Sequence, residues 1–537
     1  MSFLKSWRLA ISTLSPIHVG CGEDYDPTNY VIESNTLYEF EPGAAQKVLT
    51  DQDRRELLRI VGNPSNKRML QEVQAFFYQR RQALMTVAKR RVPAVPKLVE
   101  FYEGRVGKTV QTEGDGSQLV NKLAIGRTFF NPVSGTPILP GSSLKGAIRT
   151  ALLDGINNGK TLQGQEKNLA LQQRLFRYRE FEQDPMRLLQ LADASFLEIE
   201  GVGSELRFAV NRRRKAPKPG ENSEKSLAEK GDLYQLLECI PAARFRVLVG
   251  QLTIQCVDGV NDEHNRLPAW PLRWDAQQIV AACNRFYRPQ LEMELEQMQE
   301  RGYLNSRWAT TIKRLLDGPF EQEIVNHQAF LLRVGRHSGA ESVTLDGVRN
   351  IKIMRGKDQS PDYRPKTTTW WLAASDTQAK TEMLPFGWLL IELQPANQEL
   401  SSWPEVQEEL TKLPTEYIAW LNREHQQAEM ARRRQAEMKA RQEKEAAKAT
   451  FSLEQQAIAE LRDWFQVDRK AKQLKPVGRV VGTLNRLLKE GLSWPLADRQ
   501  ELAVLAEEIF NQKSVGGDDK MQRERQAKIQ QLREGST

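Results

Sequence analysis

The sequence predicts an α+β protein, in which a sheet is covered by helices, followed by an all-helical C-terminal extension. Three observations predict this class. Strand-like and helical patterns alternate over the first 400 residues, ARFRVLVGQLTIQC is a strong strand pattern, and the chain beyond residue 400 is rich in Glu, Gln, Arg, Lys and Ala. A ferredoxin-like core with insertions suits this order of elements, although periodicity alone leaves the topology open.

The first elements are predicted from alternation and turn residues. Residues 7–19 are predicted as a strand that ends in a glycine-rich loop, GCGEDYDP. Two short strands, NYVIES and TLYEFEP, follow with Asn35 at the turn between them. The pattern over about 43–100 is helical and basic, which predicts a helical insertion into the core.

The stretch ILPGSSLKGAIRTALLDG predicts a helix over residues 143–154, with Ser142 or Ser143 as its cap and Gly155 as its end. Strands are predicted in LLQLADASFLEIEGV, ELRFAV and ARFRVLVGQLTIQC, and helices over 275–316. Two later strands are predicted in FLLRVGRHSGAESV and MLPFGWLLIEL.

The chain of 537 residues is too long for one compact core, so several domains are expected. We expect a core over residues 1–400 and a charged, exposed helix or linker over 401–450. A small helical bundle is expected over 451–537, with a frayed tail from Gly516.

Composition limits the function classes. The net charge is 77 − 69 = +8, which weakly favours a polyanionic partner. The four cysteines and five histidines are scattered, so neither a disulfide framework nor a metal cluster is expected. No apolar run has the length of a membrane span or a signal peptide. We expect a cytoplasmic protein that has no cofactor and no membrane partner.

The predicted helix start around Gly141 offers a phosphate-shaped environment. Free backbone N–H groups, the Ser142 hydroxyl and the cations of Lys145 and Arg149 fall together at helical spacing. This is not a nucleotide P-loop, because Lys145 precedes Gly146 and Ala follows it. The alternative is a capped surface helix with ordinary solvated cations.

Several segments, in order, resemble the RAMP proteins of CRISPR–Cas systems. They are SPIHVGCGEDYDPTNYVIE, ILPGSSLKGAIRTALL, DPMRLLQLADAS, LLRVGRHSGAES and MLPFGW. The Pro-Gly-Ser-Ser-x-x-Gly element is shared widely among RAMP proteins. The His-x-Gly-x-Gly loop, followed by Asp, Tyr and Tyr-Val, resembles the family of fifth Csm subunits of type III-A effector complexes. The resemblance covers roughly residues 7–395.

The resemblance implies an RRM-like, ferredoxin-like core, with pieces at 7–19, 143–154, 275–300 and 386–393. It implies an RNA-binding structural subunit of a Csm complex that ends the backbone filament and caps the 3′ side of the CRISPR RNA. Such a subunit aids guide maturation and antiviral defence and is not an enzyme. The implied partners are CRISPR RNA, target RNA, backbone subunits, small helical subunits and a host nuclease that trims the guide. The C-terminal helices depart from the family pattern and fit either a docking bundle or an appendage.

The resemblance also implies which residues contact RNA. Glycines let the backbone approach the guide and cations neutralise its phosphates, which gives affinity without sequence readout. The implied RNA-binding residues are Gly141, Ser142, Ser143, Lys145, Gly146, Arg149, Arg333, Gly335, Arg336 and His337. Further RNA-binding candidates are Arg127, from its place before the Pro-Gly-Ser-Ser turn, and Arg212, Arg213 and Arg214, from the density of their charge. The run 211–225 is expected to be a basic loop, with a solvated loop as the alternative. A structural salt bridge is the alternative for Arg127.

An alternative function is a RAMP-fold endoribonuclease that uses Asp26 or His18. Histidine can act as a general base, and a carboxylate can hold a metal or position a 2′-hydroxyl. Asp26 lies in the first loop, where the neighbouring backbone subunits of such complexes carry a cleaving aspartate. Trp370 and Trp371 could stack on bases, but aromatic residues in such a pattern are more often part of the core.

Overall fold

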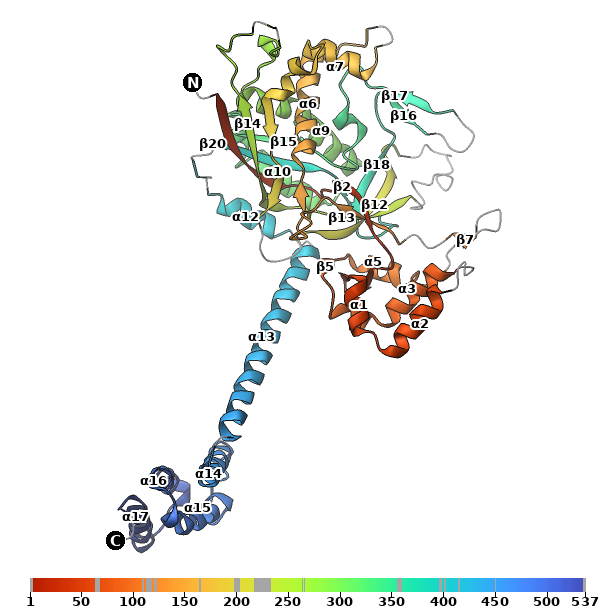
Figure 1. Cartoon of the computed structure of the whole chain (residues 1–537). Helices are drawn as coiled ribbons and strands as arrows, with labels where there is room; N and C mark the ends of the chain where they lie inside the picture. Colours follow the sequence, from red (N-terminus) through yellow and green to blue (C-terminus); the bar gives the residue numbers. More distant parts are fainter. Residues whose placement is uncertain are drawn as a thin grey trace. The chain divides into compact units, whose positions relative to one another are not determined.

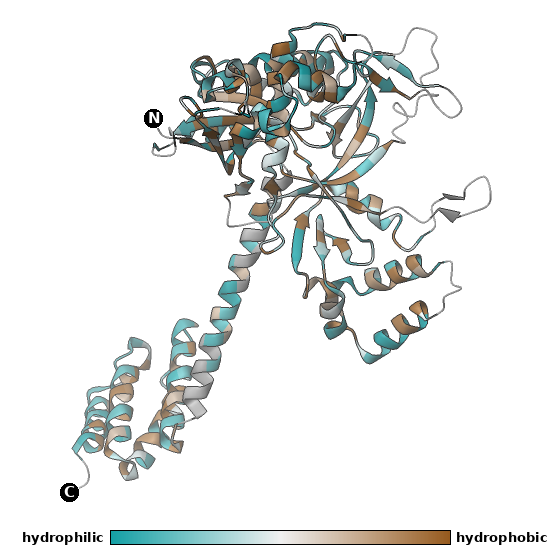
Figure 2. Ribbon diagram, turned by 45° about the horizontal axis from the view of Figure 1, so that its top comes forward, coloured by the Kyte–Doolittle hydropathy of each residue, from teal (hydrophilic) through white to brown (hydrophobic). Residues whose placement is uncertain are grey.

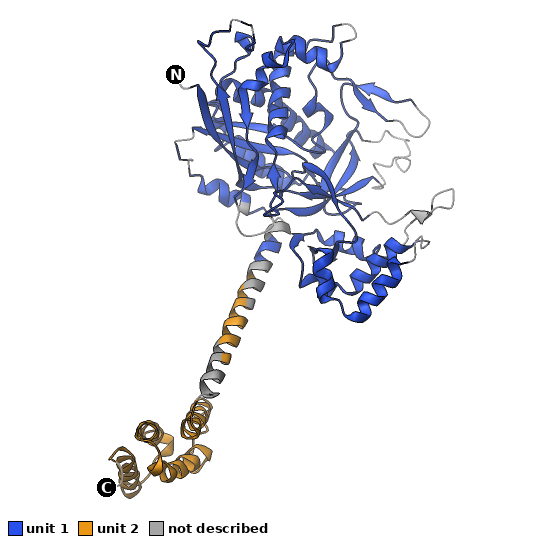
Figure 3. Ribbon diagram, in the orientation of Figure 1, with its two compact units in different colours: residues 1–422 blue, residues 423–537 orange. Residues whose placement is uncertain are grey.

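The computed structural model separates the chain into two compact units, residues 1–422 and 423–537 (Figure 3). Each unit has its own hydrophobic core. The residues that the structure describes are 3–62, 68–108, 111–112, 118–119, 123–163, 166–197, 203–216, 233–262, 264, 266–354, 360–395, 398–399, 402–413, 416–449 and 451–534.

Unit 1 is built around an antiparallel sheet with the strand order β15–β20–β1–β14–β11–β9 (Figure 1). Its strands are β15 (Ala329–Arg333), β20 (Trp388–Pro395), β1 (Leu4–Thr13), β14 (Arg244–Gln255), β11 (Ala194–Phe196) and β9 (Ile138–Leu139). A short strand, β10 (Leu189–Leu191), also pairs with β14. β1 lies between β14 and β20, with Leu9 opposite both Gly250 and Leu393.

The order of these elements along the chain is β1, α6 (Gly141–Asn157), β11, β14, α9 (Ala276–Glu300) and β20. In the sheet, β20 lies beside β1, and β14 separates β1 from β11. A βαββαβ chain with the fourth strand beside the first is the ferredoxin-like arrangement. The predicted α+β class with a ferredoxin-like core is therefore confirmed. β15 is an additional edge strand between α9 and β20.

The boundaries of α6 differ from the predicted helix over 143–154. The helix begins at Gly141, whose amide donates to Asp193 Oδ1 at 2.7 Å. That acceptor comes from a distant aspartate, so the prediction of a Ser142 or Ser143 cap is wrong. The predicted end at Gly155 is also wrong. Gly155 lies inside the helix, which continues to Asn157, and its lack of a side chain leaves room for the Arg285 guanidinium of α9.

α9 begins with a capping box in which Asp275 and Gln278 exchange hydrogen bonds with each other's backbone. The helix is joined to its surroundings by buried polar groups. Its Tyr287 hydroxyl donates to the Ala147 carbonyl of α6 at 3.1 Å. Its Glu294 carboxylate accepts from the Arg333 guanidinium at 2.9 Å and from the Trp388 indole at 2.8 Å. Glu294 therefore fixes α9 against β15 and β20.

A second sheet has the order β19–β18–β12–β13–β8–β2. Its strands are β19 (Leu384–Pro385), β18 (Thr369–Ala374), β12 (Glu205–Arg213), β13 (Tyr234–Cys239), β8 (Ile125–Thr128) and β2 (Gly20–Tyr25). The strand predicted over 7–19 is thus divided: β1 ends at Thr13, and the chain enters the second sheet at Gly20. β2 pairs antiparallel with β8, with Tyr25 opposite Ile125.

Among its described residues, the predicted insertion over about 43–100 contains helices and one strand, and this strand completes a three-stranded sheet with the hairpin that precedes the insertion. β3 (Tyr30–Glu33) and β4 (Thr36–Glu39) form the predicted hairpin, and Ser34 and Asn35 both have positive φ at its turn. The other elements are α1 (Pro42–Val48), α2 (Asp51–Val61), α3 (Met69–Gln79), α4 (Arg81–Met85), β5 (Arg90–Pro93) and α5 (Pro96–Glu103). β5 returns to pair with β4.

The C-terminal helices are α12 (Pro404–Thr411), α13 (Glu416–Ala449), α14 (Leu453–Lys470), α15 (Arg479–Glu490), α16 (Leu496–Phe510) and α17 (Asp519–Glu534). The prediction of a frayed tail from Gly516 is wrong. α17 buries Ile529 and Leu532 in the core of unit 2, although its other residues are mostly hydrophilic (Figure 2). Among the described residues, none of the helices has the length and apolar character that a membrane span needs.

Glu294→Ala leaves the buried Arg333 guanidinium without its carboxylate. We expect the free energy of unfolding of unit 1 to fall by about 3 kcal/mol. Urea unfolding followed by tryptophan fluorescence measures this, because Trp388 lies in the same contact. Glu296→Ala is the control, since Glu296 is exposed on the same helix. Equal losses in the two variants would contradict the role given to Glu294.

Candidate functional site

Two predicted sites that are far apart in the sequence meet in the structure. The loop after β1, which carries His18, contacts the turn after β15, which carries Gly335, Arg336 and His337. The Arg336 amide donates to the His18 carbonyl at 2.8 Å. Gly335 has φ +81°, and a Cβ at this position would collide with that carbonyl. We name these four residues the His18–Arg336 junction.

The two imidazoles of the junction are held neutral. His18 is 1% exposed, and its Nδ1 lies 2.7 Å from the Glu238 carbonyl. Burial lowers the pKa of His18, and the charge of Arg336 lowers it further, while the Glu238 carbonyl opposes the shift. Burial lowers the pKa of His337 to about 3, with smaller contributions from Arg336 and His18. The His337 ring stacks on Trp371 at 4.7 Å, and its Nε2 lies 3.0 Å from Gln235 Oε1.

Arg336 is the charged member of the junction. Its side chain is exposed, and its guanidinium makes neither a hydrogen bond nor an ion pair with the described residues. Gly20 and Gly126 lie beside the His18 ring, so little side-chain bulk surrounds the loop. The junction therefore combines an exposed guanidinium that has no partner among the described residues with two uncharged rings and a glycine-rich backbone. This combination suits the binding of a phosphate group and does not distinguish one nucleotide base from another.

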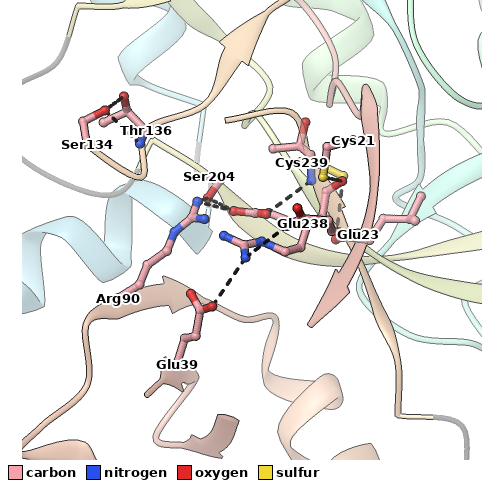
Figure 4. A network of polar contacts seen from close by, with 12 residues as sticks. Cys21, Glu23, Glu39, Arg90, Ser134, Thr136, Ser204, Glu238 and Cys239 are labelled. Atoms are coloured by element: carbon pink, nitrogen blue, oxygen red, sulfur yellow. Dashed lines mark hydrogen bonds and ion pairs between the residues drawn. The ribbon is translucent and has the colours of Figure 1, made fainter. Parts of the chain in front are cut away.

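Glu238 has a buried carboxylate, whose partners Arg90 and Ser204 are shown with it in Figure 4. Glu238 of β13 is fully buried and accepts from the Arg90 guanidinium of β5, from the Ser204 hydroxyl at 2.6 Å and from the Thr128 amide at 3.3 Å. The carbonyl of the same residue contacts His18. One residue therefore connects the insertion, the second sheet and the junction.

Arg127 belongs to this support and not to an open groove. It pairs with Glu39 at 3.4 Å and lies over the Phe130 ring at 4.0 Å, and its side chain is 11% exposed. The salt-bridge alternative accounts for Arg127.

Asp26 and His18 are not brought together as a catalytic pair. The Asp26 carboxylate accepts from the Thr28 amide at 2.8 Å and from the Thr28 hydroxyl at 2.6 Å, so it closes its own turn. His18 is buried and engaged with Glu238. In the described part of the chain, no group of three His, Cys, Asp or Glu side chains is placed to hold a metal ion.

The cations at the start of α6 are used inside the protein. Lys145 Nζ donates to the Leu189 carbonyl at 2.8 Å, and burial lowers the pKa of its ammonium group. Arg149 pairs with Asp184 at 2.9 Å and donates to Gln172. These contacts fix α6 to β10 and to the segment before it. Lys145 and Arg149 are therefore neither free for a phosphate nor simply solvated, which were the two alternatives predicted from the sequence.

The two glycines of this helix start have different surroundings. A Cβ at Gly141 would collide with the Leu191 carbonyl, so packing against the β10–β11 connection requires this glycine. Gly146 is exposed, and a Cβ there would meet nothing within 4 Å. Ser142 is exposed and Ser143 is half-buried. The open surface of α6 is therefore the backbone around Ser142 and Gly146.

The expectation of a basic loop over 211–225 is wrong at its first residues, because β12 continues to Arg213. Arg212 is buried and donates to the Thr377 and Ala379 carbonyls. Arg214 pairs with Glu341 at 3.1 Å. Residues 217–225, including Lys218, lie outside the described residues.

Arg333 is also internal, because it pairs with Glu294. Trp370 is buried, as the core alternative expected, while Trp371 is half-buried against His337.

Sequence reasoning missed Glu238, Gln235 and Trp371 as partners of the junction. A weak signal exists for Glu238, since it is a single acidic residue within the apolar strand LLECI. A charge in a buried strand needs a partner, but the sequence does not identify Arg90, which lies 148 positions away.

Comparisons with known proteins agree with the resemblance seen in the sequence. Residues 10–267 match the model of the RAMP superfamily. A curated relative from Streptococcus thermophilus, "CRISPR system Cms protein Csm5", is 26% identical over 155 residues, which are 28% of this chain and 38% of the relative. The chain thus matches less than half the length of this relative. The predicted RAMP resemblance is confirmed for residues 10–267.

Two solved structures are also similar to this chain. A chain of a Csm–crRNA–target RNA ternary complex from a type III-A CRISPR–Cas system has a TM-score of 0.42 and 16% identity, covering 72% of this chain and 100% of that one. The Csm5 protein of T. onnurineus has a TM-score of 0.39 and 14% identity, covering 72% of this chain and 99% of that one.

The neutral His337 ring predicts a loss of stability in acid. Its pKa is about 3 in the folded chain and 6.5 ordinarily, so the unfolded chain binds the proton first as the pH falls. Stability is retained above about pH 6.5 and is lost between that value and about pH 3. The expected loss from pH 7 to pH 5 is about 2 kcal/mol for this residue.

Urea unfolding at these two pH values measures the effect. His337→Asn should remove that part of the pH dependence. His264→Asn is the control, because His264 is exposed, and it should leave the pH profile unchanged. An unaltered profile in His337→Asn would contradict the neutral ring.

Proposed function

We propose that this chain, whose residues 10–267 form a RAMP-superfamily region, is an RNA-binding structural subunit of a type III-A CRISPR effector complex. In this role it caps the 3′ side of the CRISPR RNA and ends the backbone filament in the cytoplasm. Its partners are the CRISPR RNA, the target RNA in the assembled complex, and the other backbone and small helical subunits. A host nuclease that trims the guide is a further partner in this proposal.

The observation that carries the proposal is the His18–Arg336 junction, in which His18 of the RAMP-matching region contacts residues 335–337, which lie beyond that region in the chain. A guide subunit must accept any spacer sequence, so it needs backbone contacts and cations and no base readout. The junction supplies the exposed Arg336 side chain, whose backbone amide donates to the His18 carbonyl. The surface of α6 at Gly146 is also open, since a Cβ there would meet nothing within 4 Å.

The cations inside the core have a different part in this proposal. Lys145, Arg149 and Arg333 hold helices and strands in place through internal partners. Replacing them would disturb the fold as well as the charge, so a loss of RNA binding in such variants would not identify a contact. Arg336 is the more direct test, because its guanidinium has no described partner to lose.

The geometry gives no specific support to the endoribonuclease alternative. A general base must reach the proton that it removes, whereas His18 is 1% exposed and its Nδ1 contacts Glu238. Asp26 accepts two hydrogen bonds from Thr28. Each residue already has a structural task that explains its position.

The assignment to a guide-bearing complex is tested by affinity purification of the chain from its own host, followed by sequencing of the small RNA that accompanies it. Repeat–spacer RNA with one defined 3′ boundary is expected. A random RNA mixture, or no RNA, would overturn the proposal. Guide RNA with a common 5′ boundary and a variable 3′ end would retain guide binding but overturn the cap.

Arg336→Gln tests the junction. We expect RNA affinity to fall several-fold and equally for unrelated sequences, because one phosphate contact is lost. The slope of log K against log salt should become shallower by about 0.7, which fluorescence anisotropy across a salt series measures. Arg59→Gln is the matched control, since Arg59 is an exposed arginine of α2. A loss confined to some RNA sequences, or equal in both variants, would contradict a backbone contact.

A further inference from the structure

Unit 2 contains a basic segment that the proposed guide-binding core does not use. Between residues 469 and 489 the sequence has seven Lys or Arg residues and no Asp or Glu. They are Arg469, Lys470, Lys472, Lys475, Arg479, Arg486 and Lys489. A whole-chain excess of only +8 makes this local concentration unusual. The segment comprises the end of α14, the connection to α15 and most of α15.

Internal contacts hold the segment in one compact turn. Arg479, the first residue of α15, pairs with Asp468 near the end of α14, with Nη2 and Oδ1 2.6 Å apart and Nε and Oδ2 3.3 Å apart. Arg469 pairs with Glu508 of α16 at 3.3 Å. Leu474 is buried in the core of unit 2 and anchors the connection. The remaining cations are therefore carried on an ordered surface.

Five of the seven cations have nothing to neutralise them within the described structure. They are Lys470, Lys472, Lys475, Arg486 and Lys489, and all five side chains are exposed. None of them forms an ion pair or a hydrogen bond with the residues that the structure describes. By contrast, arginines elsewhere in the same unit pair with acidic residues of neighbouring helices, as Arg462 does with Glu501 and Arg533 with Glu507. Other exposed cations of unit 2, such as Lys513, Lys520 and Arg523, also lack a partner among the described residues, but acidic residues are interspersed with them in the sequence. Residues 469–489 contain no acidic residue.

The exposed face of α15 is shaped for an extended anion. Arg479, Gly482, Arg486 and Lys489 follow one another at helical spacing, opposite the buried stripe of Val480, Val481, Leu484, Leu487 and Leu488. Gly482 interrupts the cations, and a Cβ there would meet nothing within 4 Å. A glycine inside an exposed helix costs about 1 kcal/mol relative to alanine. No packing contact explains it. Its amide donates to the Gly478 carbonyl, so what the glycine leaves between Arg479 and Arg486 is a gap in side-chain bulk.

We propose that this surface, formed by Lys470, Lys472, Lys475, Arg486 and Lys489, binds the phosphate backbone of a nucleic acid independently of the core. On α15, the stripe begins at Arg479, which pairs with Asp468, and ends at Lys489 about 15 Å further along the helix, because an α-helix rises 1.5 Å per residue. That length spans about four phosphates of one duplex strand. Flexible lysines suit phosphate contacts in any sequence.

An acidic protein partner fits the surface less well. Specific protein interfaces need a desolvated apolar centre, and charges there are depleted. The exposed apolar residue of the connection is Val477, at 94% exposure, which is a single side chain and not a centre of that kind. On α15 the cations recur at helical spacing on one face, which suits the repeating charges of a phosphate backbone.

The test uses the full chain and a variant in which Lys472, Lys475, Arg486 and Lys489 are all replaced by alanine. The matched control replaces Lys513, Lys520, Arg523 and Lys528, which are exposed cations of the same unit outside the basic segment. Both variants lose four positive charges. Fluorescence anisotropy measures their affinity for single-stranded RNA, duplex RNA and duplex DNA across a salt series, and the tightest of the three identifies the source of the phosphates.

We expect the basic-surface variant to bind at least fivefold more weakly than the control, with a salt slope shallower by about 1.5 to 3. Ultraviolet crosslinking of the unmodified chain should place nucleic acid on peptides from 469–489, and this readout does not depend on the variant's folding. Equal affinity of the two variants, or crosslinks only to unit 1, would overturn the proposal. So would a crosslink from this segment to an acidic subunit of the purified complex and not to nucleic acid.

The outcome is separable from that of the proposed function. Arg336→Gln alters unit 1 and leaves the basic surface intact, while the fourfold variant does the reverse. Crosslinks on 469–489 without any guide RNA in the purified complex would support the inference and reject the guide-bearing role.

Discussion

The buried carboxylate of Glu238 is the interaction on which the arrangement of unit 1 depends. A carboxylate in a low-dielectric interior is costly unless donors surround it, and here they come from β5, from the Thr128 amide of β8 and from Ser204. Each donor belongs to a different part of the chain. The carboxylate therefore specifies how the insertion returns to the second sheet, and the backbone of the same residue holds His18.

Similar pairs fix the helices of the core. Glu294 joins α9 to the edge of the first sheet, and Asp184 holds Arg149 of α6. A buried pair contributes little net stability compared with a well-packed apolar contact, but losing one partner is severe. Such pairs therefore select one arrangement among the many that an apolar core alone would permit.

Close backbone approaches complete this specification. Gly335 brings the turn after β15 against the His18 carbonyl, and Gly387 brings the chain before β20 against the Val334 carbonyl. Both have positive φ. A side chain at either position would separate the two loops. The exposed guanidinium of Arg336 thus owes its position to a glycine beside it.

Much of the fold could be predicted from local patterns, because the buried residues of a strand or an amphipathic helix recur at the period of that element. β14, α9 and the hairpin around Asn35 are examples. The end of the chain was harder, since α17 is hydrophilic apart from a few residues such as Ile529 and Leu532. A helix that buries so little of its surface has almost no periodic signal.

The candidate site could be predicted only by residue type. Arginine-rich and glycine-rich stretches indicated Arg212, Arg333 and Arg336 alike, yet the fold buries the first two and exposes the third. The difference lies in their partners. Glu294 is 39 positions from Arg333, and the acceptors of Arg212 are carbonyls about 165 positions away. The local sequence does not identify partners that are so remote in the chain. An arginine with an internal partner therefore cannot be distinguished from one that binds a ligand until the tertiary structure is known.

The distribution of charge gives the two units different characters. In unit 1, most of the cations predicted to bind RNA form hydrogen bonds or ion pairs inside the protein. The side chain of Arg336 stays exposed, while its backbone amide donates to the His18 carbonyl. In unit 2, the helices are held mainly by apolar stripes, and five cations around α15 have no structural task. A fold does not need unpaired like charges side by side, because they repel one another. Their presence on an ordered turn is therefore best explained by a polyanion that neutralises them. Binding of that polyanion to unit 2 does not require unit 1 to contact the same molecule.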